Sequence, residues 1–414
     1  MPAKWTFMVY MAGFNNLTDF ATKDLKEMRK VGSSDDVKIA AFIKRQDGRG
    51  AQQLIVAKRP QGDVKKEIGN ADSGKPQTML DFIRWAHQNA PADRYAIVVW
   101  NHGSGWRPDD LEDLYDVVRR SNGDTGITPR ELALRSNQKI ARSLFGTTVQ
   151  EVLQLGDPQL RGIASDDGTG HSLDTIELDR VLAKAHEEIG RPFDLLGMDA
   201  CLMSTLEVAY QTRANALNVV GSEELEPGDG WPYTAILQDL AARPNMHGAR
   251  LGEIVVKRYI QSYANRRRMW PVTQCATTTE GIKPFSTALD ELSKALREHM
   301  RRHGAAQVQA AHLRTAGFMG DLFDLRDFSA ELRRRRVGTG VKRAAKKVID
   351  SLAPNGYVLA EGHRGEAVKQ CGGVTAYLPF PGGHISPYYK DLRFAKQHRW
   401  DDFVRSYHRA ARAG

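Results

Sequence analysis

Apolar strand-like runs alternate with amphipathic helix-like runs in the first half of the chain, and this alternation constrains the fold more than any other feature. Residues 5–13, 37–45 and 94–100 are apolar enough to form buried strands. Residues 15–30 and 77–90 instead place their apolar side chains along one helical face. Alternation of this kind predicts an α/β fold, with a mostly parallel sheet flanked by helices on both faces.

The second half of the chain follows a different pattern, with three long helix-like runs and a strand-like run at residues 372–383. We therefore predict a first domain over residues 1–247 and a helix-rich α+β subdomain over residues 248–414 that packs on it. Within the first domain, residues 107–170 are irregular and rich in Arg, Gly, Asn and Ser. Such a segment is typical of an insertion on the protein surface, and insertions of this kind are often functional.

Cysteine usage and hydropathy exclude several classes of protein. The three cysteines are scattered, without a CxxC pair or a Cys/His cluster, which argues against a disulfide framework and a zinc site. No run approaches the ~18 apolar residues of a membrane span, and residues 1–16 lack a signal-peptide pattern. We expect a cytoplasmic protein without a membrane span. A secreted protein that starts at its mature N-terminus would look the same and stays an alternative.

The charge is unevenly distributed along the chain. Residues 251–414 contain 29 Lys and Arg against 15 Asp and Glu, whereas residues 1–250 contain 30 against 35. An acidic half attracts a cationic ligand, and a basic half is suited to an acidic partner or to nucleic acid.

A histidine and a cysteine follow two of the expected strands. His102 comes directly after the strand at 94–100, and Cys201 follows the apolar run at 193–198. Because the carboxyl ends of parallel strands share one edge of a sheet, we expect the two side chains to be neighbours. A thiol that attacks a carbonyl and an imidazole that moves its proton are the two groups a cysteine peptidase needs.

The residues around this pair suit the same chemistry. Gly103 lacks a Cβ, so its N–H can approach a substrate oxygen closely, and the N–H of Cys201 is a natural second donor for an oxyanion. Taken alone, His102 or Cys201 is weak evidence for catalysis, because a lone Cys is usually a small buried hydrophobe and a lone His is usually structural. The pair at adjacent strand ends makes catalysis the better hypothesis.

Long stretches of the chain resemble one family, the clostripain-like cysteine peptidases, and they occur in the family's order over almost the whole sequence. The stretches are MVYMAGFNNL (8–17), IVVWNHGSGW (97–106), DLLGMDACLMSTLEVAYQ (194–211), GSEELEPGDGWPY (221–233), GGVTAYLPFP (372–381) and YYKDLRFAKQHRWDDFVRSY (388–407). The resemblance implies a caspase-like fold, a catalytic dyad of His102 and Cys201, and cleavage after basic residues.

The resemblance also assigns two acidic residues to substrate binding. Asp199 matches the family position at the floor of the pocket for the residue before the cut, and Asp229 is the expected second wall. A carboxylate there pairs with Arg or Lys, and the bidentate fit favours Arg. Two alternatives stay open: Asp199 as a cap for the helix near residue 204, and Asp229 as an ordinary turn residue. Glu223, Glu224 and Glu226 either solvate the loop or add negative potential near the site.

Relatives in this family are often activated by a cut between the His and Cys blocks, so the long segment in between is a candidate activation segment. The alternative is an inert insertion that is never cut. The candidate self-cleavage points are Arg119, Arg120, Arg130, Arg135, Lys139, Arg142 and Arg161.

The chemistry of a Cys-His pair requires no cofactor. Some relatives depend on calcium, and the acidic clusters at 109–113 and 165–167 could supply oxygen ligands, although neither has the spacing of a defined calcium loop. Whether calcium activates the protein therefore stays open. The expected partner is a protein or peptide with a basic residue at the cut.

Two rival functions remain open from the sequence. One is a latent, regulated protease with a single narrow protein target. The other is a catalytically silent protein that binds nucleic acid or an acidic partner through the basic runs at 266–268 and 333–336. For such runs a solvated helix face is the commoner explanation, and intact His and Cys blocks argue against lost catalysis.

Overall fold

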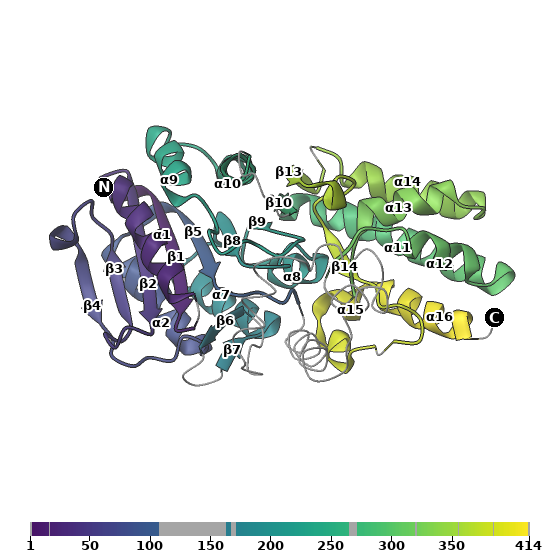
Figure 1. Cartoon of the computed structure of the whole chain (residues 1–414), viewed down its shortest axis with the longest axis horizontal. Helices are drawn as coiled ribbons and strands as arrows, with labels where there is room; N and C mark the ends of the chain where they lie inside the picture. Colours follow the sequence, from purple (N-terminus) through teal and green to yellow (C-terminus); the bar gives the residue numbers. More distant parts are fainter. Residues whose placement is uncertain are drawn as a thin grey trace, which may run out of the picture.

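A nine-stranded mixed sheet forms the centre of the protein (Figure 1). The structure is a computed structural model that describes residues 2–15, 17–106, 163–166, 171–264, 271–318, 321–354, 356–383 and 385–412. In spatial order, the strands are β13 (Val358–Arg364), β10 (Val272–Thr278), β9 (Asn218–Gly221), β8 (Leu195–Asp199), β5 (Ala92–Trp100), β1 (Ala3–Gly13), β2 (Val37–Arg45), β3 (Gln52–Ile55) and β4 (Val64–Glu67).

The strand directions confirm the α/β prediction and refine it. The central strands β2, β1, β5, β8 and β9 pair in parallel. At both edges the pairing is antiparallel, between β2, β3 and β4 on one side and between β9, β10 and β13 on the other. The sheet is therefore parallel at its centre and mixed overall.

Helices cover both faces of the sheet, as the strand β1 shows residue by residue. Met8 and Tyr10 pack into one buried cluster with α2, α7 and α8, whereas Phe7 and Val9 pack into a second cluster with α1, α9 and α10. A strand buried on both faces has to be mainly apolar, which explains the sequence of β1 apart from Lys4 and Thr6. These helices are α1 (Thr18–Val31), α2 (Pro76–Asn89), α7 (Thr175–Ile189), α8 (Leu206–Thr212), α9 (Tyr233–Ala242) and α10 (Gly248–Ser262).

The start and end of α7 illustrate how local sequence sets an element's bounds. Asp174 accepts a hydrogen bond from the Glu177 N–H, and the Glu177 side chain accepts one from the Asp174 N–H, so the two form a capping box. At the other end Gly190 takes the left-handed conformation, with φ of 81°. The capping box thus sets the first residue of this helix, and Gly190 ends it.

The second half contributes helices at the end of the molecule opposite β4 (Figure 1). They are α11 (Thr279–His303), α12 (Ala306–His312), α13 (Leu325–Arg334), α14 (Thr339–Ser351), α15 (Arg393–Gln397) and α16 (Trp400–Arg412). Two small sheets complete the described strands: β11 (Gly317–Phe318), β12 (Leu322–Asp324) and β14 (Thr375–Tyr377), and the pair β6 (Ile163–Asp166) and β7 (His171–Leu173). Because β10 and β13 belong to the central sheet, that sheet continues past residue 247, and the proposed division there stays a prediction.

A buried glutamate ties the first half to the C-terminal part. Glu207 of α8 accepts hydrogen bonds through Oε1 from the Tyr377 N–H at 2.9 Å and from the Tyr389 hydroxyl at 3.0 Å. Burial raises the pKa of Glu207 to about 7, because the low-dielectric interior disfavours the carboxylate.

Within the described ranges, no helix has the length and apolar character that crossing a bilayer requires.

We predict that Glu207→Gln changes the pH dependence of stability. Between the ordinary pKa of 4.5 and the folded value of about 7, the folded chain keeps a proton that the unfolded chain has lost. The wild type therefore loses stability relative to the variant as pH rises through this window, by on the order of 3 kcal/mol, and the difference is constant above it. Thermal unfolding at pH 5 and pH 8 measures this, with the exposed Glu298→Gln as control; a pH-independent difference would contradict the role of burial.

Candidate active site

Parallel pairing of β5 with β8 brings the histidine and cysteine segments together. Trp100, at the end of β5, is in register with Asp199, at the end of β8. The next residues continue side by side, and a Cβ placed on Gly103 would lie 2.3 Å from the carbonyl oxygen and 3.1 Å from the N atom of Cys201. Only a glycine permits this approach, so the turn that carries His102 lies directly against the backbone of Cys201.

Two asparagines hold the turn that carries His102. The Asn101 Oδ1 accepts hydrogen bonds from the Asn15 Nδ2 at 3.0 Å and from the His102 N–H, and the Asn101 Nδ2 donates to the Ala12 carbonyl at 2.7 Å. The ends of β1 and β5 are thereby joined. Sequence reasoning did not assign a role to either asparagine, although both stand in the stretches that carry the family resemblance.

Cys201 lies in a tight turn that buries its thiol. Its side chain is 8% exposed, and its Sγ accepts a hydrogen bond from the Glu226 N–H at 3.2 Å. The following residue, Leu202, has a φ of 64°, a left-handed conformation that is rare for a bulky side chain. Backbone strain of this kind is often concentrated at functional sites, because the surrounding structure has to hold it.

The environment of the pair keeps both groups neutral in the empty site. Burial raises the pKa of Cys201 to about 12, and the carboxyl groups of Glu226 and Glu224 add to the rise. Burial lowers the pKa of His102 to about 4, since the surrounding protein disfavours the imidazolium. At pH 7 the empty site therefore holds a thiol and a neutral imidazole.

Asp199 is buried beneath the loop that follows β9. Its Oδ2 accepts a hydrogen bond from the Tyr233 hydroxyl at 2.7 Å and from the Trp231 N–H at 3.4 Å. Gly230, with φ of 56°, lies so close that a Cβ there would be 3.0 Å from the Asp199 Oδ1. The alternative that Asp199 caps the next helix is wrong, because Thr205 is the N-cap of α8.

Asp229 lies in the same loop but contacts a different element. Its carboxylate forms an ion pair with Lys23 of α1, and both side chains are partly exposed. Exposed ion pairs contribute only ~0–1 kcal/mol to stability. The pair therefore leaves Asp229 able to exchange partners.

The three glutamates of this loop are all buried, so the alternative that they only solvate the loop is wrong. The Glu226 carboxyl group faces that of Asp199, and its Oε1 accepts a hydrogen bond from the Gln274 Nε2 at 3.0 Å. The signal for this role was available in the sequence as three acidic residues directly after an apolar strand. Which residues these glutamates contact depends on the order of β8, β9 and β10 in the sheet, and a local sequence pattern does not contain that order.

Glu223 of the same loop belongs to a further group of buried side chains. The carboxyl oxygens of Glu223 and Asp324 and the thiol of Cys371 come within 4.8 Å of one another. Backbone N–H groups of Gly372 and Gly373 donate to the two carboxyl groups. A thiol does not suit Ca²⁺, which binds oxygen ligands, so this cluster does not fit the calcium ion that the sequence leaves open.

Several sequence predictions fall outside the described residues. They include the acidic clusters proposed for calcium, of which the structure describes only the backbone at 165–166, and the basic run at 266–268. All candidate self-cleavage points also lie outside the described residues: Arg119, Arg120, Arg130, Arg135, Lys139, Arg142 and Arg161.

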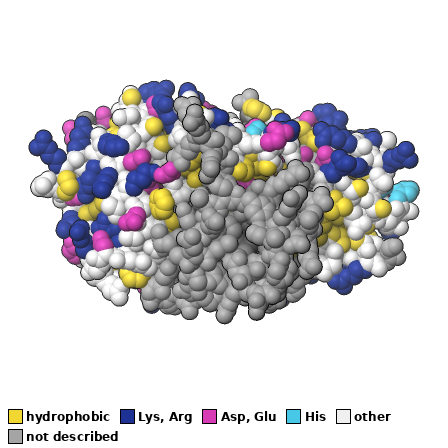
Figure 2. All heavy atoms as spheres, viewed as in Figure 1, with side chains coloured by type: hydrophobic (Ala, Val, Ile, Leu, Met, Phe, Trp, Pro, Cys, Tyr) yellow, Lys and Arg dark blue, Asp and Glu magenta, His cyan; other side chains and the backbone are white. Residues whose placement is uncertain are grey.

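The basic character of the second half is distributed over surface helices. Figure 2 shows Lys and Arg side chains at both ends of the visible face, with acidic side chains among them. In the run at 333–336, Arg334 at the end of α13 and Arg335 directly after it form ion pairs with Glu331 of α13. Part of this run is thus a solvated helix face with its own partners.

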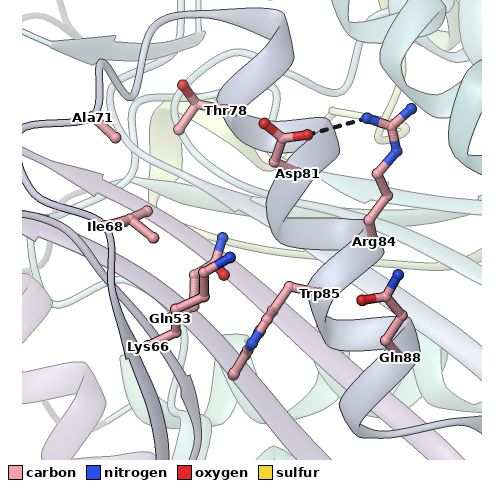
Figure 3. Close-up of a pocket in the computed structure, with 9 residues that line it drawn as sticks. All are labelled: Gln53, Lys66, Ile68, Ala71, Thr78, Asp81, Arg84, Trp85 and Gln88. Atoms are coloured by element: carbon pink, nitrogen blue, oxygen red, sulfur yellow. Dashed lines mark hydrogen bonds and ion pairs between the residues drawn. The ribbon is translucent and has the colours of Figure 1, made fainter.

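A hollow of about 350 Å³ lies between α2 and the edge strands β3 and β4 (Figure 3). Its walls include the Trp85 ring, the Gln53 side chain and the ion pair of Arg84 with Asp81. None of the residues predicted for catalysis or substrate binding lines it. This hollow is separate from the site at the ends of β5 and β8.

The fold of the chain is the fold of solved C11 proteases. More specifically, the Clostripain family model, Peptidase_C11, matches residues 9–132 and 150–407, so the chain belongs to the clostripain family. Clostripain of Hathewaya histolytica is 24% identical over 268 residues, which are 58% of this chain and 42% of that protein. The match thus spans less than half of the length of this curated relative.

Solved structures show the same fold. An inactive zymogen C11 protease from Parabacteroides distasonis superposes with a TM-score of 0.64 at 18% identity, over 96% of this chain and 98% of the other. A secreted C11 cysteine protease from Bacteroides thetaiotaomicron, in complex with an irreversible peptide inhibitor, superposes with a TM-score of 0.63 at 18% identity, over 97% and 99% of the two chains.

We predict that Gly103→Ala destabilises the protein. The added Cβ would meet the Cys201 carbonyl oxygen at 2.3 Å, so one of the two turns has to move. Forced overpacking of this kind typically costs about 1–3 kcal/mol. Calorimetric unfolding measures the change, with Gly340→Ala in α14 as control, because nothing lies within 4 Å of a Cβ there. A Gly103→Ala variant as stable as the wild type would show that the two turns are not in contact.

Proposed function

We propose that this chain is a cysteine endopeptidase that hydrolyses peptide bonds after Arg or Lys. The observation that carries the proposal is the placement of His102, Cys201 and Asp199 at two paired strand ends. Residues that carry a thiol, an imidazole and a buried carboxylate thereby lie at one edge of the sheet. Family membership and the superposition on C11 proteases support the same reaction.

In the proposed reaction, the Cys201 Sγ attacks the scissile carbonyl carbon while its proton passes to the His102 imidazole. Burial favours the neutral thiol and the neutral imidazole, so in the proposed reaction the thiol has to give its proton to His102. The protonated imidazole then gives its proton to the leaving amine, which frees the new N-terminus. A water molecule attacks the thioester with His102 as base, and the carboxylate product leaves as the thiol is restored.

The N–H groups of Gly103 and Cys201 are the proposed donors to the oxyanion. Their support is the contact between the two backbones, which leaves room for no side chain at residue 103. Donors fixed by the backbone are already oriented when negative charge develops on the carbonyl oxygen, so they stabilise the transition state without reorganisation.

Asp199 is the proposed partner of the substrate's basic side chain, with Asp229 as the second wall. Tyr233 and the Trp231 N–H stabilise the charge of Asp199 by hydrogen bonds. Lys23 forms an exposed ion pair with Asp229, and in the proposed reaction the cationic side chain of the substrate competes with Lys23 for this carboxylate.

A latent, regulated protease is a second candidate function, favoured by the state of the thiol. The Cys201 Sγ is buried and hydrogen-bonded to the Glu226 N–H, so a resting chain has to open before a substrate carbonyl can reach it. Activation by self-cleavage between the His and Cys blocks would supply such a change. Calcium activation, a cytoplasmic location and an acidic or nucleic-acid partner stay predictions.

Fluorogenic peptides that end in Arg, Lys, Asp or Leu test the proposed specificity. We predict release after Arg and Lys only, with a loss of roughly 10⁴-fold or more in Cys201→Ala and in His102→Ala. Asp199→Asn should lower kcat/KM for the basic substrates by roughly 10- to 100-fold, because a charged hydrogen bond is replaced by a neutral one. Release that persists in Cys201→Ala, or a preference for Asp or Leu, would contradict the proposal.

Self-cleavage is tested on the purified chain before any substrate is added. We predict that the wild type yields two fragments on a denaturing gel, cut after a basic residue between 107 and 170, and that Cys201→Ala stays intact. N-terminal sequencing of the second fragment identifies the cut. An active wild type that remains a single chain would show that self-cleavage is not required.

A further inference from the structure

One residue, Glu226, contacts both the thiol and the buried carboxyl group of the site. Its N–H donates to the Cys201 Sγ at 3.2 Å, and its carboxyl group faces that of Asp199, with the buried Oε2 receiving no hydrogen bond from a donor group of the described residues. Gln274 of β10 fixes the side chain by donating to Oε1 at 3.0 Å. The residue before a cut lies next to the attacking sulfur, so Glu226 is in the position of a pocket wall.

A hydrogen bond between two carboxyl groups requires a proton. Ionised carboxylates only accept hydrogen bonds, so either Asp199 or Glu226 must carry one for the facing pair to form such a bond. The titratable groups that face the pair are Asp24 and Glu27 from α1, Tyr233 from α9, Tyr259 from α10, and the thiol of Cys201. All of these are acidic or neutral. Lys23, a cation on the α1 side, is bound to Asp229.

We propose that Glu226 is a specificity-determining residue that shares one proton with Asp199 in the empty pocket and releases it when the side chain of a substrate arginine binds. This proposal rests on the proposed function, since it describes the same pocket. The proton goes to solvent, the O–H bond of Glu226 is lost, and no other covalent bond changes. The two carboxylates then bind the guanidinium from two sides.

The environment decides which of the two carboxyl groups holds the proton. Burial raises the pKa of Glu226 well above its ordinary value, and the nearby Asp199 raises it further. Burial also raises the pKa of Asp199, to about 6, but hydrogen bonds from Glu226, Tyr233 and Trp231 oppose the rise. At pH 7 Asp199 is therefore mostly ionised, and Glu226 is the proton carrier.

An arginine suits this pair better than a lysine. The guanidinium is planar and has five N–H donors, so it can bond two carboxylates at once, whereas an ammonium acts as a point charge. Two ionised carboxylates in a buried site are costly without a cation. The bound arginine removes this cost, and the shared proton removes it when the pocket is empty.

Asp24 is the alternative source of a released proton. It is buried, accepts a hydrogen bond from the Trp100 Nε1 at 2.8 Å, and has a pKa raised to about 9 by burial and by the charge of Asp199. It does not share the hydrogen bond of the pair with Asp199. A test must therefore compare Glu226 with Asp24 directly.

Calorimetry of benzoyl-arginine amide binding to Cys201→Ala is the test, at pH 7 in two buffers of different ionisation enthalpy. The dependence of the binding enthalpy on the buffer gives the number of protons released. We expect about one proton per ligand in Cys201→Ala and in Cys201→Ala/Asp24→Asn. In Cys201→Ala/Glu226→Gln we expect about none, because an amide keeps its hydrogens. Thermal unfolding checks that each variant is folded.

Three outcomes would overturn the proposal: no release in Cys201→Ala, an unchanged release in the Glu226→Gln variant, or a release that disappears with Asp24→Asn instead. In the otherwise wild-type enzyme, Glu226→Gln should raise KM for arginine substrates, change kcat little and lower the ratio of Arg to Lys cleavage. An unchanged ratio would also count against it. Failure of the proposed function looks different, because the wild type then cleaves no arginine peptide and the ligand does not bind.

Discussion

The parallel pairing of β5 with β8 is the interaction on which the site depends. Its register places Trp100 opposite Asp199, so the turns after both strands leave the sheet at the same edge. The contact between Gly103 and the Cys201 backbone then fixes the distance between the two turns more narrowly than the sheet alone does. A histidine and a cysteine that are far apart in sequence are thus adjacent because of backbone geometry, before any side-chain contact is considered.

Burial gives the site its electrostatic character. Asp199 and Glu226 are buried, and a buried carboxylate is costly unless it is paired or neutralised. Hydrogen bonds from Tyr233 and Trp231 meet part of this cost, and the proposed shared proton meets the rest. In the proposed reaction a cationic substrate side chain takes the place of that proton, so one arrangement accounts for both a stable pocket and the proposed preference for basic residues.

Sequence patterns that act locally predicted the fold well. The strand at Ala3–Gly13 is apolar on both faces because both faces are covered, and the Asp174 and Glu177 pair marks the start of α7. Other features depend on contacts between distant segments, which no local pattern contains. Glu226 is recognisable as a partner of Asp199 only once the loop after β9 is placed over the end of β8. The same holds for the pair of Lys23 with Asp229 and for the left-handed turn at Leu202.

A crystal structure of the wild type after reaction with a peptidyl-arginine chloromethyl ketone would show whether the paired strand ends form the active site. We expect a covalent bond from the Cys201 Sγ, with the inhibitor oxygen facing the N–H groups of Gly103 and Cys201. We also expect the guanidinium within hydrogen-bond distance of Asp199 and Glu226. An adduct on Cys275 or Cys371, or an arginine side chain that lies away from both carboxylates, would contradict this account.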